Sequence, residues 1–453
     1  MKFDVLFTSH KKFYQTKITK SYQFRIERLR KLQTTIKKYE PKILEALALD
    51  LGKSHEESIL TEVSVVLSDL NHTIKNLRRW MKSKKVKTPL VLFPGKSKIV
   101  KEPYGTVLIL SPWNYPFQLA MNPLIGAIAG GNTVVLKPSP LSEHTSLVIK
   151  EIIDEIFSSD FVSCVLGGIE EANQLLDLKF DYIFFTGSTN VGKHVMEKAS
   201  KNLTPVTLEL GGKSPVYIDE TFDLDLAAKR IVFGKLINAG QTCIAPDYLF
   251  IKEGLEETFI KHAMKHVEAF YTANPIEANN YPKLITERHL KRQLALIEPH
   301  HVVYGGKSNK EKLEPTFLLN VKKEDQVMQE EIFGPILPIM IYQELDEVIS
   351  YILEHDKPLA FYVFSNNKNA VKKLMHTISF GGATVNDTLM HFVNQNLPFG
   401  GVGGSGMGAY HGKYSFDTFT HQKPILTRGK LDLPFRYQPV NKRTLKILRK
   451  FTK

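Results

Sequence analysis

Apolar and polar residues follow two different periods along this chain of 453 residues. Between residues 22 and 38, apolar side chains recur at helical spacing among arginines and lysines, which predicts a helix. We expect a second helix over 41–49, with Pro41 in its first turn, and a longer third helix over 56–81. The segment 82–94 is basic and is interrupted by two prolines, so it is expected to form an extended arm that leaves the body.

From residue 105 the pattern changes to short apolar runs that alternate with helical segments. Strands are expected at 106–110, 133–136, 161–166, 182–185 and 206–210. The helices between them are expected at 117–129, 142–156, 170–176 and from about 187 to 200. Buried strands separated by helices predict a parallel sheet that is covered on both faces, in the doubly wound layout that binds nucleotides.

A second alternating region follows Gly211 and Gly212. Its strand candidates are 214–218, 248–251, 335–341, 360–364 and 383–386. Its helices are expected near 225–237, 256–271, 287–297, 345–353 and 368–378. The whole pattern predicts an α/β protein of more than one domain.

The net charge of +13 is concentrated at the two ends of the chain. Residues 1–38 carry 11 Lys and Arg against 2 acidic residues, and residues 428–453 carry 9 against 1. The long middle section is therefore acidic overall, which argues against a nucleic-acid-binding protein. No apolar stretch has the length of a signal peptide core or a membrane span, so a cytoplasmic protein is expected.

The basic tail itself has an amphipathic pattern. Leu445, Leu448 and Phe451 recur at helical spacing among Lys and Arg. Such a helix can lie on an anionic membrane, whereas the more common alternative is a solvated terminal helix or one that docks on a dimer partner. Peripheral membrane contact is therefore the weaker of the two interpretations.

Cysteine and histidine spacing limits the chemistry that the chain can perform. The only two cysteines, Cys164 and Cys243, have no CxxC partner, and the histidines show no metal-ligand spacing. We expect no disulfide and no metal site. Cys164 falls in the apolar run 161–166 and is interpreted as core packing.

Cys243 has a different setting, in Gly-Gln-Thr-Cys-Ile-Ala-Pro (240–246). We expect it in a loop at the entry to a helix, among small and polar residues rather than in an apolar core. A thiolate is a strong nucleophile, and its pKa depends on these surroundings. An inert buried cysteine is the alternative.

Two polar residues are expected at the carboxyl ends of strands, where side chains of an α/β domain reach the ligand crevice. Glu209 ends the run 206–210, with Leu208 and Leu210 on the opposite face. It is either a general base with a raised pKa or a salt-bridged structural residue. Asn114 follows the run 106–110, and its amide suits either an oxyanion donor or a helix cap.

Two glycine-containing segments complete the candidate site. Gly-Ser-Thr-Asn-Val-Gly (187–192) follows a strand and opens a helix, and backbone N–H groups at a helix N-terminus bind phosphate. Residues 397–408 contain six glycines, which permit positive φ and close backbone approach. The second segment is either a flexible loop or one that packs against the active site.

Six motifs in this order resemble the aldehyde dehydrogenase superfamily. They are Ser-Pro-Trp-Asn-Tyr-Pro, Phe-Thr-Gly-Ser-Thr-Asn-Val-Gly, Leu-Glu-Leu-Gly-Gly-Lys-Ser-Pro, Gly-Gln-Thr-Cys-Ile-Ala-Pro-Asp-Tyr, Glu-Glu-Ile-Phe-Gly-Pro and Leu-Pro-Phe-Gly-Gly-Val-Gly-Gly-Ser-Gly. The Ala-Pro-Asp-Tyr ending and residues 386–391 look like the class 3, fatty-aldehyde branch. The resemblance spans roughly residues 20 to 430.

The resemblance implies a role for each matched position. Cys243 matches the nucleophile, Glu209 the general base and Asn114 the oxyanion donor, together with the backbone N–H of Cys243. Cofactor contacts are implied for Trp113, Lys137, Gly187, Ser188, Thr189, Asn190, Val191, Gly192, Glu331 and Phe333. The implied reaction is NAD(P)-dependent oxidation of an aldehyde to a carboxylic acid through a thioester. Apolar Tyr115, Phe117, Ile237 and Phe399 suit a medium-chain, long-chain or aromatic aldehyde, although they are equally compatible with the core.

One position departs from the family pattern and bears on the cofactor. Many members have Glu after Lys-Pro-Ser, where its carboxylate would repel a 2′-phosphate, but this chain has Pro140. NAD is the implied cofactor, and NADP use is left open. An acylating dehydrogenase that uses coenzyme A or phosphate, and a non-catalytic scaffold, are the alternatives. Glu209 argues against the first alternative, and the presence of Cys243, Glu209 and Asn114 together argues against the second.

The resemblance also implies a domain plan and a homodimer. Residues 1–81 and 100–210 would form a Rossmann-type dinucleotide-binding domain, 211–390 the catalytic domain, and 82–99 with 391–430 a bridging segment before the basic tail 431–453. Segments 82–94 and 418–426 would pair as a two-stranded oligomerisation flap that reaches the partner.

Overall fold

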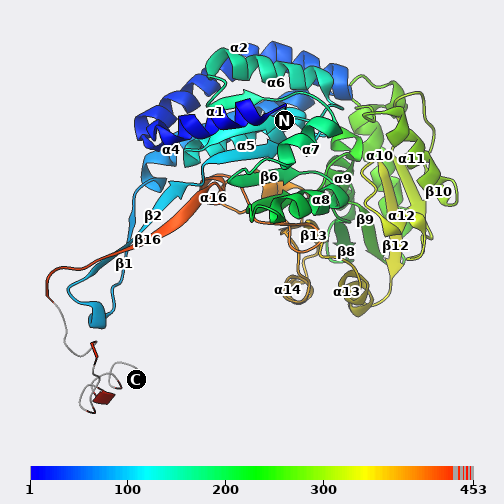
Figure 1. Ribbon diagram of the computed structural model, residues 1–453. Coiled ribbons are helices and arrows are strands. Elements are labelled where there is room, and N and C mark those ends of the chain that lie inside the picture. The colour runs from blue at the N-terminus through cyan, green and yellow to red at the C-terminus, as the bar shows by residue number, and fades with distance from the viewer. Residues whose placement is uncertain (1, 432–436, 439–441, 443–444, 447–448, 450–453) are drawn as a thin grey trace.

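The computed structural model describes residues 2–431 together with 437–438, 442, 445–446 and 449. Figure 1 shows a helix-covered body from which a thin arm of strands projects. The predicted helix over 441–453 and most of the tail 431–453 lie outside the described residues. The predicted α/β class, with two large sheets and a small β element, is confirmed.

A layer of helices precedes the first sheet. It consists of α1 (Asp4–Gln15), the short η1 (Ile18–Lys20), α2 (Tyr22–Leu51), α3 (His55–Ser58), the π-helical turn η2 (Ile59–Val63) and α4 (Ser64–Trp80). The prediction of two helices over 22–38 and 41–49 is wrong, because one helix runs through Pro41. Its buried side chains continue on both sides of Pro41, so packing against the body outweighs the N–H that proline lacks.

The first sheet has six strands in the order β15-β7-β6-β3-β4-β5, all parallel except β15. The strands are β3 (Thr106–Leu110), β4 (Thr133–Lys137), β5 (Val162–Cys164), β6 (Tyr182–Thr186), β7 (Val206–Glu209) and β15 (Gly406–Met407). The helices that follow them are α5 (Pro116–Gly130), α6 (Glu143–Ile156), α7 (Ile169–Leu176) and α8 (Thr189–Ser200). The expected strands and helices of this region are present, and the two-residue β15 was not foreseen.

Alternation along β3 divides the core into two layers. Leu108 and Leu110 pack in a cluster that includes Phe3 of the N-terminal segment, whereas Val107 and Ile109 belong to the large cluster on the other face. Cys164 is also buried in the large cluster, where burial raises its pKa to about 12. Its interpretation as a core residue is confirmed.

The second sheet has seven strands in the order β10-β11-β12-β9-β8-β13-β14, parallel except for the β10–β11 pair. The strands are β8 (Pro215–Ile218), β9 (Tyr248–Lys252), β10 (His301–Tyr304), β11 (Thr316–Leu319), β12 (Ile336–Tyr342), β13 (Ala360–Phe364) and β14 (Gly382–Val385). The associated helices are α9 (Leu224–Leu236), η4 (Ile237–Gly240), α10 (Glu256–Tyr271), η5 (Pro275–Glu277), α11 (Glu287–Ile297), α12 (Gln326–Gln329), α13 (Leu345–Leu353), α14 (Lys368–Thr377) and α15 (Met390–Val393). The sequence pattern predicted five of these strands and missed β10 and β11.

The projecting arm is a three-stranded antiparallel sheet rather than the expected two-stranded flap. It contains β1 (Lys84–Val86), the turn η3 (Leu90–Leu92), β2 (Lys96–Pro103) and β16 (Thr420–Thr427), which follows α16 (Lys413–Thr418). The central strand is β2, and both β1 and β16 pair with it. The predicted pairing of 82–94 with 418–426 is therefore wrong, because β2 lies between them.

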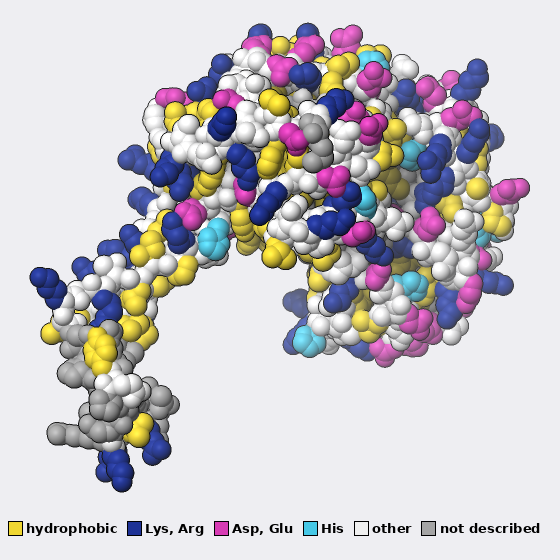
Figure 2. All heavy atoms as spheres, viewed as in Figure 1, with side chains coloured by type: hydrophobic (Ala, Val, Ile, Leu, Met, Phe, Trp, Pro, Cys, Tyr) yellow, Lys and Arg dark blue, Asp and Glu magenta, His cyan; other side chains and the backbone are white. Residues whose placement is uncertain are grey.

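The surface of the arm is basic, as the sequence indicated. Figure 2 shows Lys and Arg side chains along it. Lys84 and Lys85 of β1 are exposed, as is Lys87 just after it. Within the described part of the chain, none of the helices combines the length and the apolar character that crossing a membrane requires.

Candidate active site

Three successive residues in the left-handed region turn the chain sharply before Cys243. Asn238, Ala239 and Gly240 have φ values of 53°, 50° and 75°. The turn follows α9 and leads into β9, so Cys243 lies between a helix and a strand. The expectation of a helix-entry loop is therefore wrong. Non-glycine residues in this conformation are uncommon and costly, which indicates that packing around the turn holds it in place.

The sulfur of Cys243 is partly enclosed. Its side chain packs against the large core cluster and keeps some exposure. Burial raises the thiol pKa above its usual value of 9.0, and the carboxylates of Glu331 and Glu209 raise it further. The expected setting is therefore only half correct. Polar groups are near the thiol, but they are two carboxylates that oppose formation of the thiolate, and the side chain also packs against the apolar core.

Asn114 lies in the loop between β3 and α5. Its Nδ2 donates a hydrogen bond to the Gln241 carbonyl oxygen at 3.1 Å, two residues before Cys243. The residue that precedes α5 is Tyr115, and the N–H groups of the first turn are accepted by Glu62 Oε2 rather than by Asn114. The cap interpretation is therefore excluded. Next to this contact, the hydroxyl groups of Tyr115 and Thr242 are 2.6 Å apart, which forms a further hydrogen bond between the Asn114 loop and the Cys243 loop.

Glu209 is the last residue of β7 and is only 3% exposed. Leu208 and Leu210 lie in the core on the opposite side, as strand alternation predicted. Among the residues that the structure describes, neither carboxylate oxygen of Glu209 has a hydrogen-bond partner, and burial raises its pKa well above 4.5. The salt-bridge alternative is therefore excluded, and the raised pKa expected of a general base is present.

The glycine-rich segment 397–408 packs against this carboxylate. A Cβ on Gly400 would lie 2.3 Å from the Gly408 carbonyl oxygen and 3.1 Å from Glu209 Oε1, so glycine lets two parts of this segment pass close together beside the carboxylate. Ser405 accepts a hydrogen bond from the Leu210 N–H, and Gly406 pairs with Glu209 across β15 and β7. Of the two interpretations of this segment, the structure supports the packed loop.

Glu331 and Phe333 are held in place by a salt bridge nearby. Lys213 Nζ contacts Asp247 at 2.5 Å and donates to two carbonyl oxygens of residues 327–330, while Asp247 accepts the Ile332 N–H. A Cβ on Gly211 would lie 2.0 Å from Glu331 Oε2, which explains glycine at that position.

The carboxyl group of Glu331 is only partly satisfied, by a hydrogen bond from the Gly212 backbone N–H. Its Oε1 is buried without a hydrogen-bond partner, and burial raises its pKa to about 8. Phe333, at φ 52°, meets the ring of Trp113 edge-on with the centroids 5.5 Å apart. His289 touches the other side of Trp113 at 5.1 Å, a neighbour that the sequence gave no reason to select.

The N-terminus of α8 lies beside Glu209. The Gly187 N–H donates to the Glu209 carbonyl oxygen, and a Cβ on Gly192 would collide with Leu210. Ser188, Asn190 and Val191 are exposed, whereas Thr189 is half-buried. Lys137 ends β4, where its Nζ donates to the Gly167 carbonyl oxygen at 2.7 Å. The implied cofactor residues thus come from three strand ends of the first sheet and from one loop of the second.

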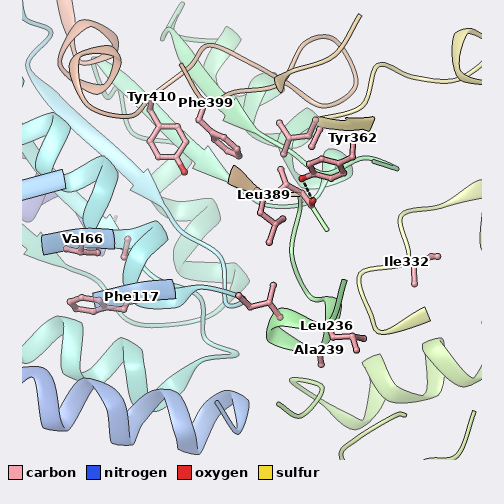
Figure 3. Packing of buried hydrophobic residues seen from close by; sticks show 14 of the residues in the cluster. Val66, Phe117, Leu236, Ala239, Ile332, Tyr362, Leu389, Phe399 and Tyr410 are labelled. Carbon is pink, nitrogen blue, oxygen red and sulfur yellow. Dashed lines mark hydrogen bonds between the residues drawn. The ribbon is translucent and has the colours of Figure 1, made fainter. Parts of the chain in front are cut away.

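Aromatic residues close the site on the side of the second sheet. The Tyr362 hydroxyl donates to the Ile244 carbonyl oxygen at 2.6 Å. Figure 3 shows Tyr362, Leu389 and Phe399 in the same part of the cluster. Tyr410 packs edge-on against Phe399, with the ring centroids 5.7 Å apart. Tyr115, Phe117, Ile237 and Phe399 are all buried, at 8% exposure or less. The sequence did not select Tyr362, because an aromatic residue in an apolar run shows no sign of the loop it will contact, and it did not select Tyr410 either.

Comparisons with known proteins agree with this arrangement. The profile of the family described as "Aldehyde dehydrogenase family" matches residues 8–425. The 4,4'-diaponeurosporen-aldehyde dehydrogenase of Staphylococcus aureus is 50% identical over 427 residues, which cover 93% of each chain. Aldehyde dehydrogenase family 3 member A2 of Pongo abelii is 46% identical over 90% of this chain and 84% of the relative.

A third relative and a solved structure extend the comparison. A mouse (Mus musculus) protein named "Aldehyde dehydrogenase, dimeric NADP-preferring" is 44% identical, with 91% of each chain covered. The solved substrate-bound state of Staphylococcus aureus AldH superposes with a TM-score of 0.97 at 48% identity and 99% coverage of both chains. The chain belongs to the aldehyde dehydrogenase family, and it is an NAD(P)-dependent enzyme that oxidises aldehydes to carboxylic acids.

Proposed function

We propose that Cys243 is the nucleophile of this oxidation, Asn114 the oxyanion donor and Glu209 the general base. The single observation that carries the proposal is the state of Glu209. Its carboxylate is buried and has no hydrogen-bond partner among the described residues, which is costly to a fold. It also lies close enough to raise the pKa of Cys243, which is partly exposed, whereas Cys164 is buried.

The reaction then follows from the residue types. Cys243 sulfur attacks the aldehyde carbon, and the N–H of Cys243 and Nδ2 of Asn114 stabilise the oxygen as it becomes negative. The thiohemiacetal loses a hydride and becomes a thioester. Glu209 then takes a proton from a water molecule, whose oxygen attacks the thioester carbon and releases the acid and the thiol.

The dinucleotide site fits the residues present. Glu331 Oε1 is a buried acceptor without a partner, which suits a ribose hydroxyl, and the start of α8 offers exposed backbone to a phosphate. We assign Trp113, Phe333 and Lys137 to the same site, with residues 187–192. When bound there, the nicotinamide ring accepts the hydride.

The cofactor preference is proposed to be dual. Pro140 is exposed in the loop that follows β4, and it has no carboxylate that would repel a 2′-phosphate. The mouse relative is named as NADP-preferring, which is consistent with this reading. Pro140→Glu should shift the ratio of kcat/KM toward NAD, because a carboxylate would then face the extra phosphate.

For the substrate, we propose a medium-chain, long-chain or aromatic aldehyde. The side chains beside Cys243 are apolar and aromatic, and the Staphylococcus aureus relative is named for diaponeurosporen-aldehyde. Residues 1–81 with 100–210 would bind the cofactor and 211–390 would carry the nucleophile. Residues 82–99 with 391–430 would bridge a homodimer through the arm, and two relatives carry "dimeric" in their names.

The test is steady-state and single-turnover production of reduced cofactor with a panel of aldehydes. Cys243→Ala should abolish turnover, and Glu209→Gln should leave a single burst, because the thioester forms but is not hydrolysed. Cys164→Ala, which changes the cysteine buried in the core, serves as the matched cysteine variant and should keep its turnover. Steady turnover in Cys243→Ala, or no burst in Glu209→Gln, would overturn the assignment.

A further inference from the structure

Asn238 occupies a position between the two halves of the proposed oxyanion site. Its Nδ2 lies 2.7 Å from the Asn114 carbonyl oxygen and 3.1 Å from the Gln241 carbonyl oxygen. One primary amide has two N–H groups, so it can serve both acceptors at once. The two carbonyls belong to different loops, one leading into α5 and the other leading to Cys243.

The Gln241 carbonyl oxygen is the junction of this arrangement. It accepts from Asn238 Nδ2 and also from Asn114 Nδ2, each at 3.1 Å. A carbonyl oxygen has two lone pairs, so both are then used. Asn114 spends one amide hydrogen on this carbonyl and keeps the other for a substrate oxygen. The direction of that second N–H is therefore fixed by the contact with Gln241.

Asn238 is in turn held by the helical layer beneath it. Its backbone N–H donates to Glu57 Oε1 at 2.7 Å, and its side chain is fully buried. The Asn114 carbonyl also faces Lys53 Nζ at 3.3 Å, and Lys53 pairs with Glu62 at 2.7 Å. Glu62 Oε2 accepts the N–H groups of the first turn of α5. The N-terminal helices thus clamp both loops.

The conformation of Asn238 adds to the argument. Its φ of 53° lies in the left-handed region, which asparagine and glycine tolerate better than other residues. Ala239 adopts nearly the same φ without any side-chain polar contact. The turn itself therefore does not require an amide at 238. What requires the amide is the pair of carbonyl acceptors.

We propose that Asn238 is a positioning residue for the oxyanion site, which aligns Asn114 with Cys243 by bridging the carbonyls of Asn114 and Gln241. The proposal rests on the oxyanion role assigned to Asn114 above. Asn238 touches neither substrate nor cofactor in this scheme, so its whole effect on the reaction passes through Asn114 and the Cys243 loop.

The test is a double-mutant cycle on kcat for aldehyde oxidation. Asn114→Ala should lower kcat by about 10²- to 10³-fold, as loss of one oxyanion donor does elsewhere. Asn238→Gly keeps the left-handed turn and deletes both donors, and we expect a loss of about 10- to 100-fold. In the Asn114→Ala background the same change should cost less than about threefold, because its target is gone.

Controls separate positioning from a general loosening of the fold. Ala239→Gly changes the neighbouring left-handed residue and should leave kcat within about twofold. Asn238→Asp keeps the size and turn preference but cannot donate, so it should resemble Asn238→Gly. Alkylation of Cys243 by iodoacetamide should stay within about threefold of wild type in Asn238→Gly, which shows that the thiol is still in place.

The outcomes distinguish a failure of the oxyanion role of Asn114 from a failure of the positioning role of Asn238. Unchanged kcat in Asn114→Ala would remove the oxyanion assignment itself. A large loss in Asn114→Ala with wild-type kcat in Asn238→Gly would overturn the positioning role alone. Additive losses in the double variant, or a matching collapse of Cys243 alkylation, would mean that Asn238 acts on the fold and not through Asn114.

Discussion

Glu62 and Glu209 are both buried carboxylates near the proposed site, and the protein treats them in opposite ways. Glu62 lies under the start of α5, where it pairs with the equally buried Lys53 at 2.7 Å and accepts two backbone N–H groups. Glu209 ends β7, and neither of its oxygens has a hydrogen-bond partner within the described part of the chain. Burial alone raises the pKa of Glu209 well above 4.5.

The difference distinguishes a buried carboxylate that stabilises the fold from one that is available for chemistry. A buried charge that serves the fold is given an opposite charge and donors, because its desolvation must be offset. A buried carboxylate that serves chemistry is left without them, so that its protonation can change during the reaction. The same distinction applies to Asp247, which Lys213 satisfies, and Glu331, whose Oε1 is left free.

The largest effect is expected when the buried ion pair between Lys53 and Glu62 is broken. Glu62→Gln leaves the Lys53 ammonium buried without a counter-charge, so we expect the free energy of unfolding to fall by about 3–5 kcal/mol. Glu209→Gln should change it by less than about 1 kcal/mol near pH 4, where the carboxyl is mostly neutral in the folded and the unfolded chain and no partner is lost. Urea unfolding of the two variants beside wild type makes the comparison, and equal losses would contradict it.

Removing both charges should restore most of that loss. In Lys53→Met with Glu62→Gln, the glutamine oxygen can still accept the N–H groups of α5, and no unpaired charge remains. We expect stability within about 2 kcal/mol of wild type. A double variant that is no more stable than Glu62→Gln alone would show that the pair contributes more than charge balance.

The pH dependence of stability should separate Glu209 from its paired counterpart. Its folded pKa is raised, so the folded state binds a proton more readily than the unfolded chain. This contribution to stability is complete below about pH 4.5 and is lost as pH rises toward the folded pKa. Glu209→Gln removes the dependence, so the variant should gain on wild type as pH increases. Stability differences that stay flat from pH 5 to 8 would contradict the unpaired state.

The smallest effect concerns the thiol. Glu331 and Glu209, in that order, raise the pKa of Cys243 beyond the effect of burial. Glu331→Gln should therefore speed iodoacetamide alkylation at about pH 8 by a few-fold in the cofactor-free enzyme, and Glu209→Gln by less. A slower reaction in Glu331→Gln would mean that its carboxylate aids the thiolate.

Much of the fold followed from local pattern. Strand alternation placed Leu208 and Leu210 in the core and Glu209 on the other side of β7, and the structure agrees. The pattern failed where distant contacts decide. Pro41 predicted the start of a second helix, yet α2 continues through it because side chains on both sides of Pro41 are buried against the body. Strands β10 and β11 were missed, and β2 was not foreseen as the centre of the arm.

By itself the sequence determined the α/β class, the candidate nucleophile, base and oxyanion donor, and the family, because these depend on periodicity and on residue types in order. Only the tertiary structure decided that Glu209 is unpaired, that Lys53 pairs with Glu62, and that Asn238 bridges two loops. The reason is physical. Burial and hydrogen-bond satisfaction belong to groups that meet across the fold, and in this chain Asn238 and Asn114 are brought together from different sheets.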